Sequence, residues 1–220
     1  QHVEKRERTT RRKRWEMQDE EQAYSAKQLD RDIVNPDQLR TVIKTFKESL
    51  PVIFPGRTEV PKTLVFAKTD SHADDIIQII REEFGGGNQF CKKVTYRVAN
   101  DKLDTEGKVL EEGEDPAAIL AQLRNDYYPR IAVTVDMIAT GTDVKALECL
   151  LFMRDVKSKN YFEQMKGRGT RTLDKDSLQK VTPSAKSAKT HYVIVDAIGV
   201  TKSMKTASRP LITKPSVALK

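Results

Sequence analysis

Cysteine is scarce in this sequence, and no metal-binding spacing is present. The 220 residues contain two cysteines, Cys91 and Cys149, and three scattered histidines, with no C-x-x-C pair. Zinc sites need closely spaced ligands, and disulfide-built folds need several paired cysteines. The sequence therefore predicts no metal site and a reducing, cytoplasmic compartment.

Long apolar runs are also missing. No stretch approaches the roughly 18 apolar residues that cross a bilayer, and the first residues are too polar for a signal peptide. We therefore expect no membrane partner. Because the chain starts without Met and begins and ends in mid-pattern, we also expect it to be a fragment of a longer protein.

Charge is unevenly distributed along the chain. The net charge is +7, but residues 1–14 carry +5 and residues 179–220 carry +7, which leaves −5 on the middle. Basic arms suggest contact with a phosphate backbone; the alternative is solvated, partly disordered ends. We predict a charged arm and connecting helix over residues 1–60, a central domain over 61–200 and a basic extension over 201–220, with partial helix over 15–29.

Strands and helices are predicted to alternate in the central domain. β-rich runs occupy residues 63–67, 93–98, 131–135, 149–153 and 192–196. Helical patterns occupy 36–50, 71–84 and a stretch that starts at Asp115-Pro116, whereas 100–115 and 173–189 have the composition of loops. This alternation predicts an α/β fold with a five- or six-stranded parallel sheet, whose functional residues should follow the carboxyl ends of the strands.

The most informative stretch is residues 161–171, YFEQMKGRGTR. On a helix, Gln164, Arg168 and Arg171 would share one face. Two adjacent guanidiniums suit a charge-dense oxyanion such as a γ-phosphate, where an arginine finger contributes roughly 10³ to 10⁵ in rate. The alternative is an ordinary solvated basic helix face.

A second polar run, TVDMIATGTD over residues 134–143, lies about 25 residues earlier at the end of a predicted buried strand. Thr134 and Thr140 can hydrogen-bond phosphates, and Gly141 permits close backbone approach. Asp143 could hold a ribose hydroxyl or orient the arginines. A simple polar turn with an Asp cap is the alternative, but the two runs together are more specific than either alone.

These runs, with TLVFAKTDSHA from residue 63 and RNDYYPRIAVTVDMIATGTDV from residue 124, resemble motifs IV, V and VI of superfamily 2 helicases. These motifs belong to the second RecA-like domain of the helicases. Their sequences here are most similar to those of the R (HsdR) subunit of type I restriction enzymes. The resemblance implies an ATP-dependent translocase of double-stranded DNA. It also implies a preceding RecA-like domain and modification and specificity subunits as partners.

The resemblance also assigns roles to residues. It implies that Arg168 and Arg171 are arginine fingers acting in trans on the first motor domain. The implied ATP-binding residues are Gln164, Gly141, Asp143 and Gly167, and the implied DNA-binding residues are Lys68, Thr69, Thr134 and Thr140.

A Walker A motif, G-x-x-x-x-G-K-[ST], and a Walker B acidic box are missing. In the family they lie on the first domain, which would hold ATP and Mg²⁺, so we expect the chain alone to be inactive. Glu106-Gly-Lys108 resembles part of a nuclease motif, but it lies in a predicted loop and we assign it no role.

Two other functions are open. One is a superfamily 2 helicase outside restriction, for example on RNA. The other is a non-catalytic nucleic-acid-binding or assembly module, whose DNA binding would not depend on Arg168 or Arg171.

Overall fold

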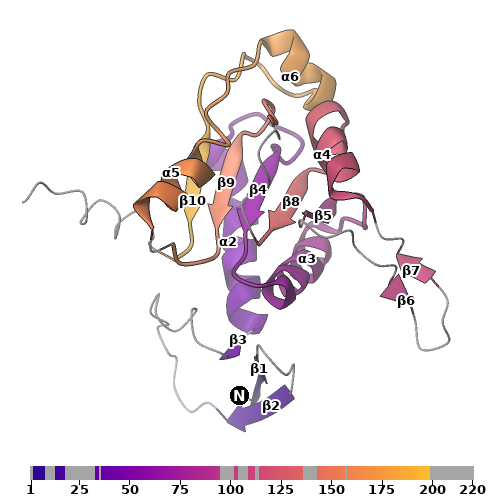
Figure 1. The fold of residues 1–220 in the computed structure, drawn as a ribbon, viewed down its shortest axis with the longest axis vertical. Helices are drawn as coiled ribbons and strands as arrows, with labels where there is room; N and C mark the ends of the chain where they lie inside the picture. The colour runs from indigo at the N-terminus through magenta and orange to yellow at the C-terminus, as the bar shows by residue number, and fades with distance from the viewer. Residues whose placement is uncertain are drawn as a thin grey trace, which may run out of the picture.

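The computed structural model describes residues 2–7, 13–17, 33–34, 36–94, 102–103, 109–111, 114–135, 143–156 and 158–198. The main body consists of α2 (Pro36–Ile53), β4 (Thr63–Phe66), α3 (Asp70–Phe84), β5 (Cys91–Val94), α4 (Pro116–Asn125), β8 (Ile131–Thr134), β9 (Cys149–Phe152), α5 (Lys159–Lys166), α6 (Lys175–Val181) and β10 (Val193–Asp196) (Figure 1). Two small antiparallel sheets lie outside it, formed by β1 (His2–Glu7), β2 (Lys13–Met17) and β3 (Ile33–Val34), and by β6 (Lys102–Leu103) and β7 (Val109–Glu111).

A five-stranded sheet forms the centre of the main body. Its strand order is β10-β9-β4-β8-β5, and every neighbouring pair is parallel. Phe66 on the central strand aligns with Thr134 of β8 and with Phe152 of β9. This sheet with flanking helices confirms the predicted RecA-like α/β fold.

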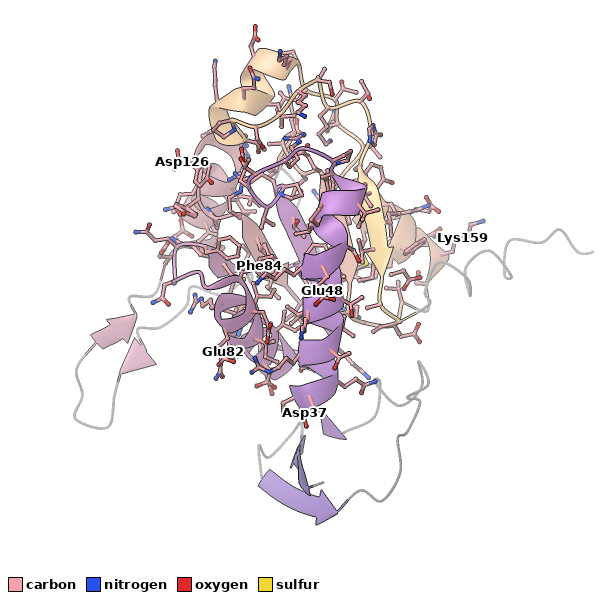
Figure 2. The ribbon with its side chains drawn as sticks, turned by 180° about the vertical axis from the view of Figure 1, so that it is seen from behind. Asp37, Glu48, Glu82, Phe84, Asp126 and Lys159 are labelled. Atoms are coloured by element: carbon pink, nitrogen blue, oxygen red, sulfur yellow. The ribbon has the colours of Figure 1, made fainter. Side chains whose placement is uncertain are left out.

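Helices cover both faces of the sheet. One core cluster joins α2 and α3 to alternate strand residues such as Val65, Val133 and Leu151. A second cluster joins α4 and α5 to the opposite face through residues such as Phe66 and Phe152. Figure 2 looks onto the first face, where α2 lies in front of the sheet with Glu48 on its exposed side. Every residue of β4, β8 and β9 is buried, as expected for parallel strands covered on both sides.

Local capping signals account for the helix boundaries. α3 begins after Thr69, whose side chain accepts a hydrogen bond from the His72 amide, and ends at Gly85 with φ of 64°. α4 begins after Asp115, with Pro116 in its first turn, as the sequence predicts. The sequence predicts Asp70 or Ser71 as the capping residue, which was wrong, because the Thr69 hydroxyl supplies the cap and α3 begins at Asp70.

Three other sequence-based predictions were wrong. Residues 175–181 form α6 rather than a loop, because Asp174 caps the helix and Leu178 and Val181 pack beneath it. Residues 13–17 form a strand rather than the start of a helix, because their backbones pair with β1. Residues 102–103 and 109–111 form a short hairpin inside the predicted acidic loop. Residues 95–98 of the second predicted strand lie outside the described residues.

Two buried cations organise the amino-terminal end of the sheet. Lys62 is fully buried, and its Nζ donates to the carbonyls of Asp126, Tyr127 and Pro129 at 2.6, 3.1 and 2.7 Å. Arg130, 1% exposed, lies beside it, immediately before β8. The two side chains satisfy carbonyl oxygens that would otherwise be buried without partners.

The titration of Lys62 gives a pH prediction. Burial lowers the pKa of Lys62 to about 7, and repulsion by Arg130 contributes to this shift. A lysine in an unfolded chain has a pKa of about 10.4. Between these values the unfolded chain binds more protons, so the free energy of unfolding must rise with pH. From pH 7 to 9 we expect the wild type to gain about 1–3 kcal/mol relative to Lys62→Met, measured by urea unfolding. Parallel pH profiles for the two proteins would contradict this.

Candidate functional site

The loop after β4 carries the two residues assigned to motif IV. Lys68 and Thr69 follow the carboxyl end of the central strand, and both are half-buried. The Lys68 amide donates to Nδ1 of His72 at 3.3 Å, and the Thr69 oxygen caps α3. This geometry orients the loop through its backbone. The DNA-binding role of the two side chains stays a prediction.

Thr134 ends β8 at the same edge of the sheet. Its carbonyl accepts a hydrogen bond from the Ala67 amide at 2.8 Å, and the residue is only 2% exposed. In this conformation it offers almost no surface to a DNA phosphate, so we leave it out of the proposed DNA contact. Thr140 and Gly141, the other two motif V residues singled out by the sequence, lie outside the described residues.

Helix α5 carries the start of motif VI. It begins after Ser158, whose hydroxyl accepts from the Tyr161 amide, and it packs Phe162 and Met165 into the core. The helix ends at Lys166, and Gly167 is its cap. Gln164 is exposed on the helix.

The prediction that Gln164, Arg168 and Arg171 form one helical stripe was wrong. A tight turn follows α5, in which the Arg168 amide donates to the Met165 carbonyl at 3.2 Å. Arg171 lies beyond this turn, in chain that is neither helix nor strand. Two glycines within three residues, Gly167 and Gly169, explain the early end, because glycine is a poor helix former.

Motif V and motif VI nevertheless meet in space. Arg171 Nε lies 3.5 Å from Asp143 Oδ1, and the two side chains are 66% and 40% exposed. An ion pair this exposed contributes about 1 kcal/mol or less to stability. A phosphate could therefore replace Asp143 as the partner of the Arg171 guanidinium, or share the guanidinium with it, at little cost.

This pair lies toward the amino-terminal end of the sheet, not the carboxyl end that the sequence reasoning predicted. The Asp143 carbonyl accepts from Arg124 Nε at 3.0 Å, and Arg124 is in the last turn of α4, just before β8 begins. A cavity of about 550 Å³ adjoins Asp143, with Arg124, Lys145 and Lys180 in its lining. Asp143 and Arg171 therefore lie at the opposite end of the strands from Lys68 and Thr69.

A buried lysine holds the segment between the two arginines. Lys189 Nζ donates to the Gly169 carbonyl at 2.8 Å and also to the Arg171 carbonyl. Gly169 itself packs against Tyr192, whose ring would lie 2.5 Å from a Cβ at that position. The segment is therefore fixed by close packing on one side and by a cation on the other.

Gly169 should not tolerate a larger residue. The Cβ of Gly169→Ala would overlap Cγ and Cδ2 of Tyr192, which cannot swing away as the tip of a flexible side chain can. We expect the free energy of unfolding to fall by about 1–3 kcal/mol, measured with urea. Gly87→Ala is the matched control, because nothing lies within 4 Å of the added carbon. Equal stability of the two variants would contradict this packing.

Sequence reasoning missed Lys189 and Arg124 as contributors to the site. Arg124 lies in one of the runs that resemble the helicase motifs. Its role is visible only in the structure, where its side chain donates to the Asp143 carbonyl. Lys189 follows a Ser- and Lys-rich stretch, where composition alone does not separate it from solvated lysines such as Lys186. Only its burial, 4% exposed, distinguishes it.

Within the described part of the chain, no group of three or more His, Cys, Asp or Glu side chains could hold a metal ion. No described helix is both long and apolar enough to cross a membrane.

The chain is similar in sequence to two restriction subunits. It is 26% identical over 204 residues to the endonuclease subunit of the type I restriction enzyme EcoKI from Escherichia coli K12, covering 91% of this chain and 16% of that protein. It is also 26% identical over 161 residues to the EcoAI endonuclease subunit from Escherichia coli, covering 69% and 17%. The chain thus spans about one sixth of the length of these relatives. No family model matches it.

Among solved structures, the fold is similar to a fragment assigned to the HsdR subunit of a type I restriction enzyme from Vibrio vulnificus YJ016. The TM-score is 0.53 with 22% identity, over 80% of this chain and 30% of that one. The parallel sheet and the two sequence similarities together support a second RecA-like domain of an HsdR-like protein.

Proposed function

We propose that the chain is the second motor domain of an ATP-dependent double-stranded DNA translocase within a type I restriction endonuclease. The observation that carries this proposal is the meeting of Asp143 and Arg171 on an exposed surface. A guanidinium held by a weak ion pair can transfer to a phosphate at small cost. Arg168, half-exposed in the preceding turn, would add a second positive charge nearby.

ATP would lie between this domain and a preceding RecA-like domain. The donor set fits the terminal phosphate: Arg168 and Arg171 would bind it, and Asp143 would orient Arg171 or hold a ribose hydroxyl. Gln164, Gly141 and Gly167 are proposed to line the nucleotide side. Mg²⁺ would be held by the preceding domain, and the chain alone would be inactive.

Double-stranded DNA would contact the opposite edge, where Lys68 and Thr69 follow β4. Arg154 supports this edge, because its guanidinium donates to the Val135 carbonyl at 2.8 Å and ties the chain after β9 to the end of β8. The further partners proposed are modification and specificity subunits. Cys91 and Cys149 are buried free thiols, which fits the proposed cytoplasmic location.

The test is DNA-stimulated ATP turnover of the full-length protein, wild type against Arg171→Ala, with DNA binding measured in parallel. Loss of turnover with binding retained supports a motor role. Unchanged turnover would instead favour a nucleic-acid-binding module. Stimulation by RNA in preference to DNA would favour a helicase outside restriction.

A further inference from the structure

Lys189 combines deep burial with an unusual set of contacts. It lies at the base of the segment 169–173, is 4% exposed, and directs its Nζ at two backbone carbonyls, those of Gly169 and Arg171. Its own backbone pairs with Leu173 in both directions, at 2.8 and 3.1 Å. Lys189 thus contacts the backbone of Gly169, Arg171 and Leu173.

The surroundings of Lys189 act on its charge in opposite directions. Burial lowers the pKa of Lys189, while the carboxylates of Glu148 and Asp143 act in the opposite direction. Glu148 is itself buried and pairs with Arg57 at 2.6 Å. An ammonium group whose protons are used by two carbonyls is a rigid anchor, because each charge-assisted hydrogen bond restricts the angle of the chain.

The two carbonyls bracket Thr170 and Arg171, one before Thr170 and one after the Cα of Arg171. Gly169 packs against Tyr192, but residues 170–172 lie in neither helix nor strand. Arg171 would therefore sample many positions if the two carbonyls were released. Catalytic arginines need near-fixed placement, since small displacements cost large factors in rate.

We propose that Lys189 is a positioning residue that holds the segment from Gly169 to Arg171 in the conformation that presents Arg171 to ATP. The proposal rests on the function proposed above. Lys189 touches neither ATP nor the reacting atoms; it acts through the backbone of Arg171. It is therefore expected to affect kcat more than the KM for ATP.

The test is a double-mutant cycle in the full-length protein, with Lys189→Met, Arg171→Ala and their combination. Methionine keeps the length of the side chain and removes the donors. We expect Lys189→Met to lower the kcat of DNA-stimulated ATP turnover about 10- to 100-fold, with KM for ATP within about threefold. In the Arg171→Ala background the same change should lower kcat by less than about twofold, because the residue being positioned is gone.

Lys62→Met is the matched control. Lys62 is also a fully buried lysine that donates to backbone carbonyls, but it holds the chain at 126–129. We expect hydrogen exchange of peptides covering 167–174 to speed up in Lys189→Met and to stay near wild type in Lys62→Met. If Lys189→Met does not fold, Lys189→Gln, which keeps one amide donor group, takes its position in the same cycle.

Several outcomes would overturn the proposal. Additive losses in the double mutant, or equal losses of kcat in Lys62→Met, would reduce Lys189 to a stabilising residue. A normal kcat in Lys189→Met beside a large loss in Arg171→Ala would remove this proposal alone. Normal turnover in Arg171→Ala would remove both this proposal and the motor function on which it rests.

Discussion

Replacing Arg171 with alanine is expected to lower DNA-stimulated ATP turnover of the full-length protein by about 10³-fold or more. The loss should appear in kcat, because an arginine finger acts on charge that develops during phosphoryl transfer. Folding should be little affected, since the only ion pair described for this side chain, with Asp143, is exposed and worth about 1 kcal/mol or less. Steady-state ATP turnover with saturating double-stranded DNA measures the effect.

The control for this experiment is Arg40→Ala. Arg40 is also an exposed, ion-paired arginine, bonded to Glu82 at 2.5 Å and Glu83 at 2.6 Å, but it lies on α2. Its loss should leave turnover within about twofold of wild type. If Arg171→Ala retained turnover within a few-fold of wild type, the arginine would be an ordinary solvated side chain.

The largest expected effect on stability is at Arg130. Its guanidinium donates to the carbonyls of Val60, Tyr127 and Val181 at 2.7, 3.0 and 2.5 Å, and to Thr182 Oγ1 at 3.0 Å. Arg130→Met would leave the Val60 and Val181 carbonyls and Thr182 Oγ1 without this donor, whereas the Tyr127 carbonyl keeps its hydrogen bond from Lys62. We expect the free energy of unfolding to fall by about 3–5 kcal/mol, the scale found when one partner of a buried polar network is removed. Urea unfolding of the 220-residue chain measures it.

Arg40→Met is the control, because it makes the same Arg-to-Met replacement at a surface position. It removes an arginine with two ion pairs from the surface, where such pairs contribute about 1 kcal/mol or less. A loss at Arg130 no larger than at Arg40 would mean that water replaces the guanidinium at the amino end of the sheet. The network would then be a minor contributor to stability.

The elements with strong local signals could be predicted from the sequence. Asp115-Pro116 marks the start of α4, Gly85 marks the end of α3, and the apolar runs at 63–67, 131–135 and 149–153 became the three central strands within one residue. These signals depend on capping and on burial of both faces, which are properties of short windows. The sequence did not predict α6, because only Leu178 and Val181 of this helix pack into the core. Its other residues are of types typical of solvent-exposed loops.

The geometry of the site was harder to predict, since it depends on tertiary contacts. The residue types at Asp143 and Arg171 were identified, but their location was not, because no helix is described between β8 and β9 to suggest how the chain returns. The helical spacing predicted that Arg171 lies on the same helix as Gln164. This was wrong, because the helix ends at Lys166, before Gly167 and Gly169. The contacts of Lys189 join residues 18 and 20 positions apart, beyond the reach of any local pattern.

The return of the chain after β8 has a consequence for how the two edges influence each other. Thr134 lies at the edge of Lys68, while Asp143, only nine residues later, lies with Arg171 at the other end of the strands. Under the proposed function, these nine residues of covalent chain link the end of the sheet proposed to face DNA to the end proposed to face the nucleotide. Binding free energies coupled in this way are reciprocal. Whatever factor ATP applies to the equilibrium affinity for DNA, DNA must apply to the affinity for ATP.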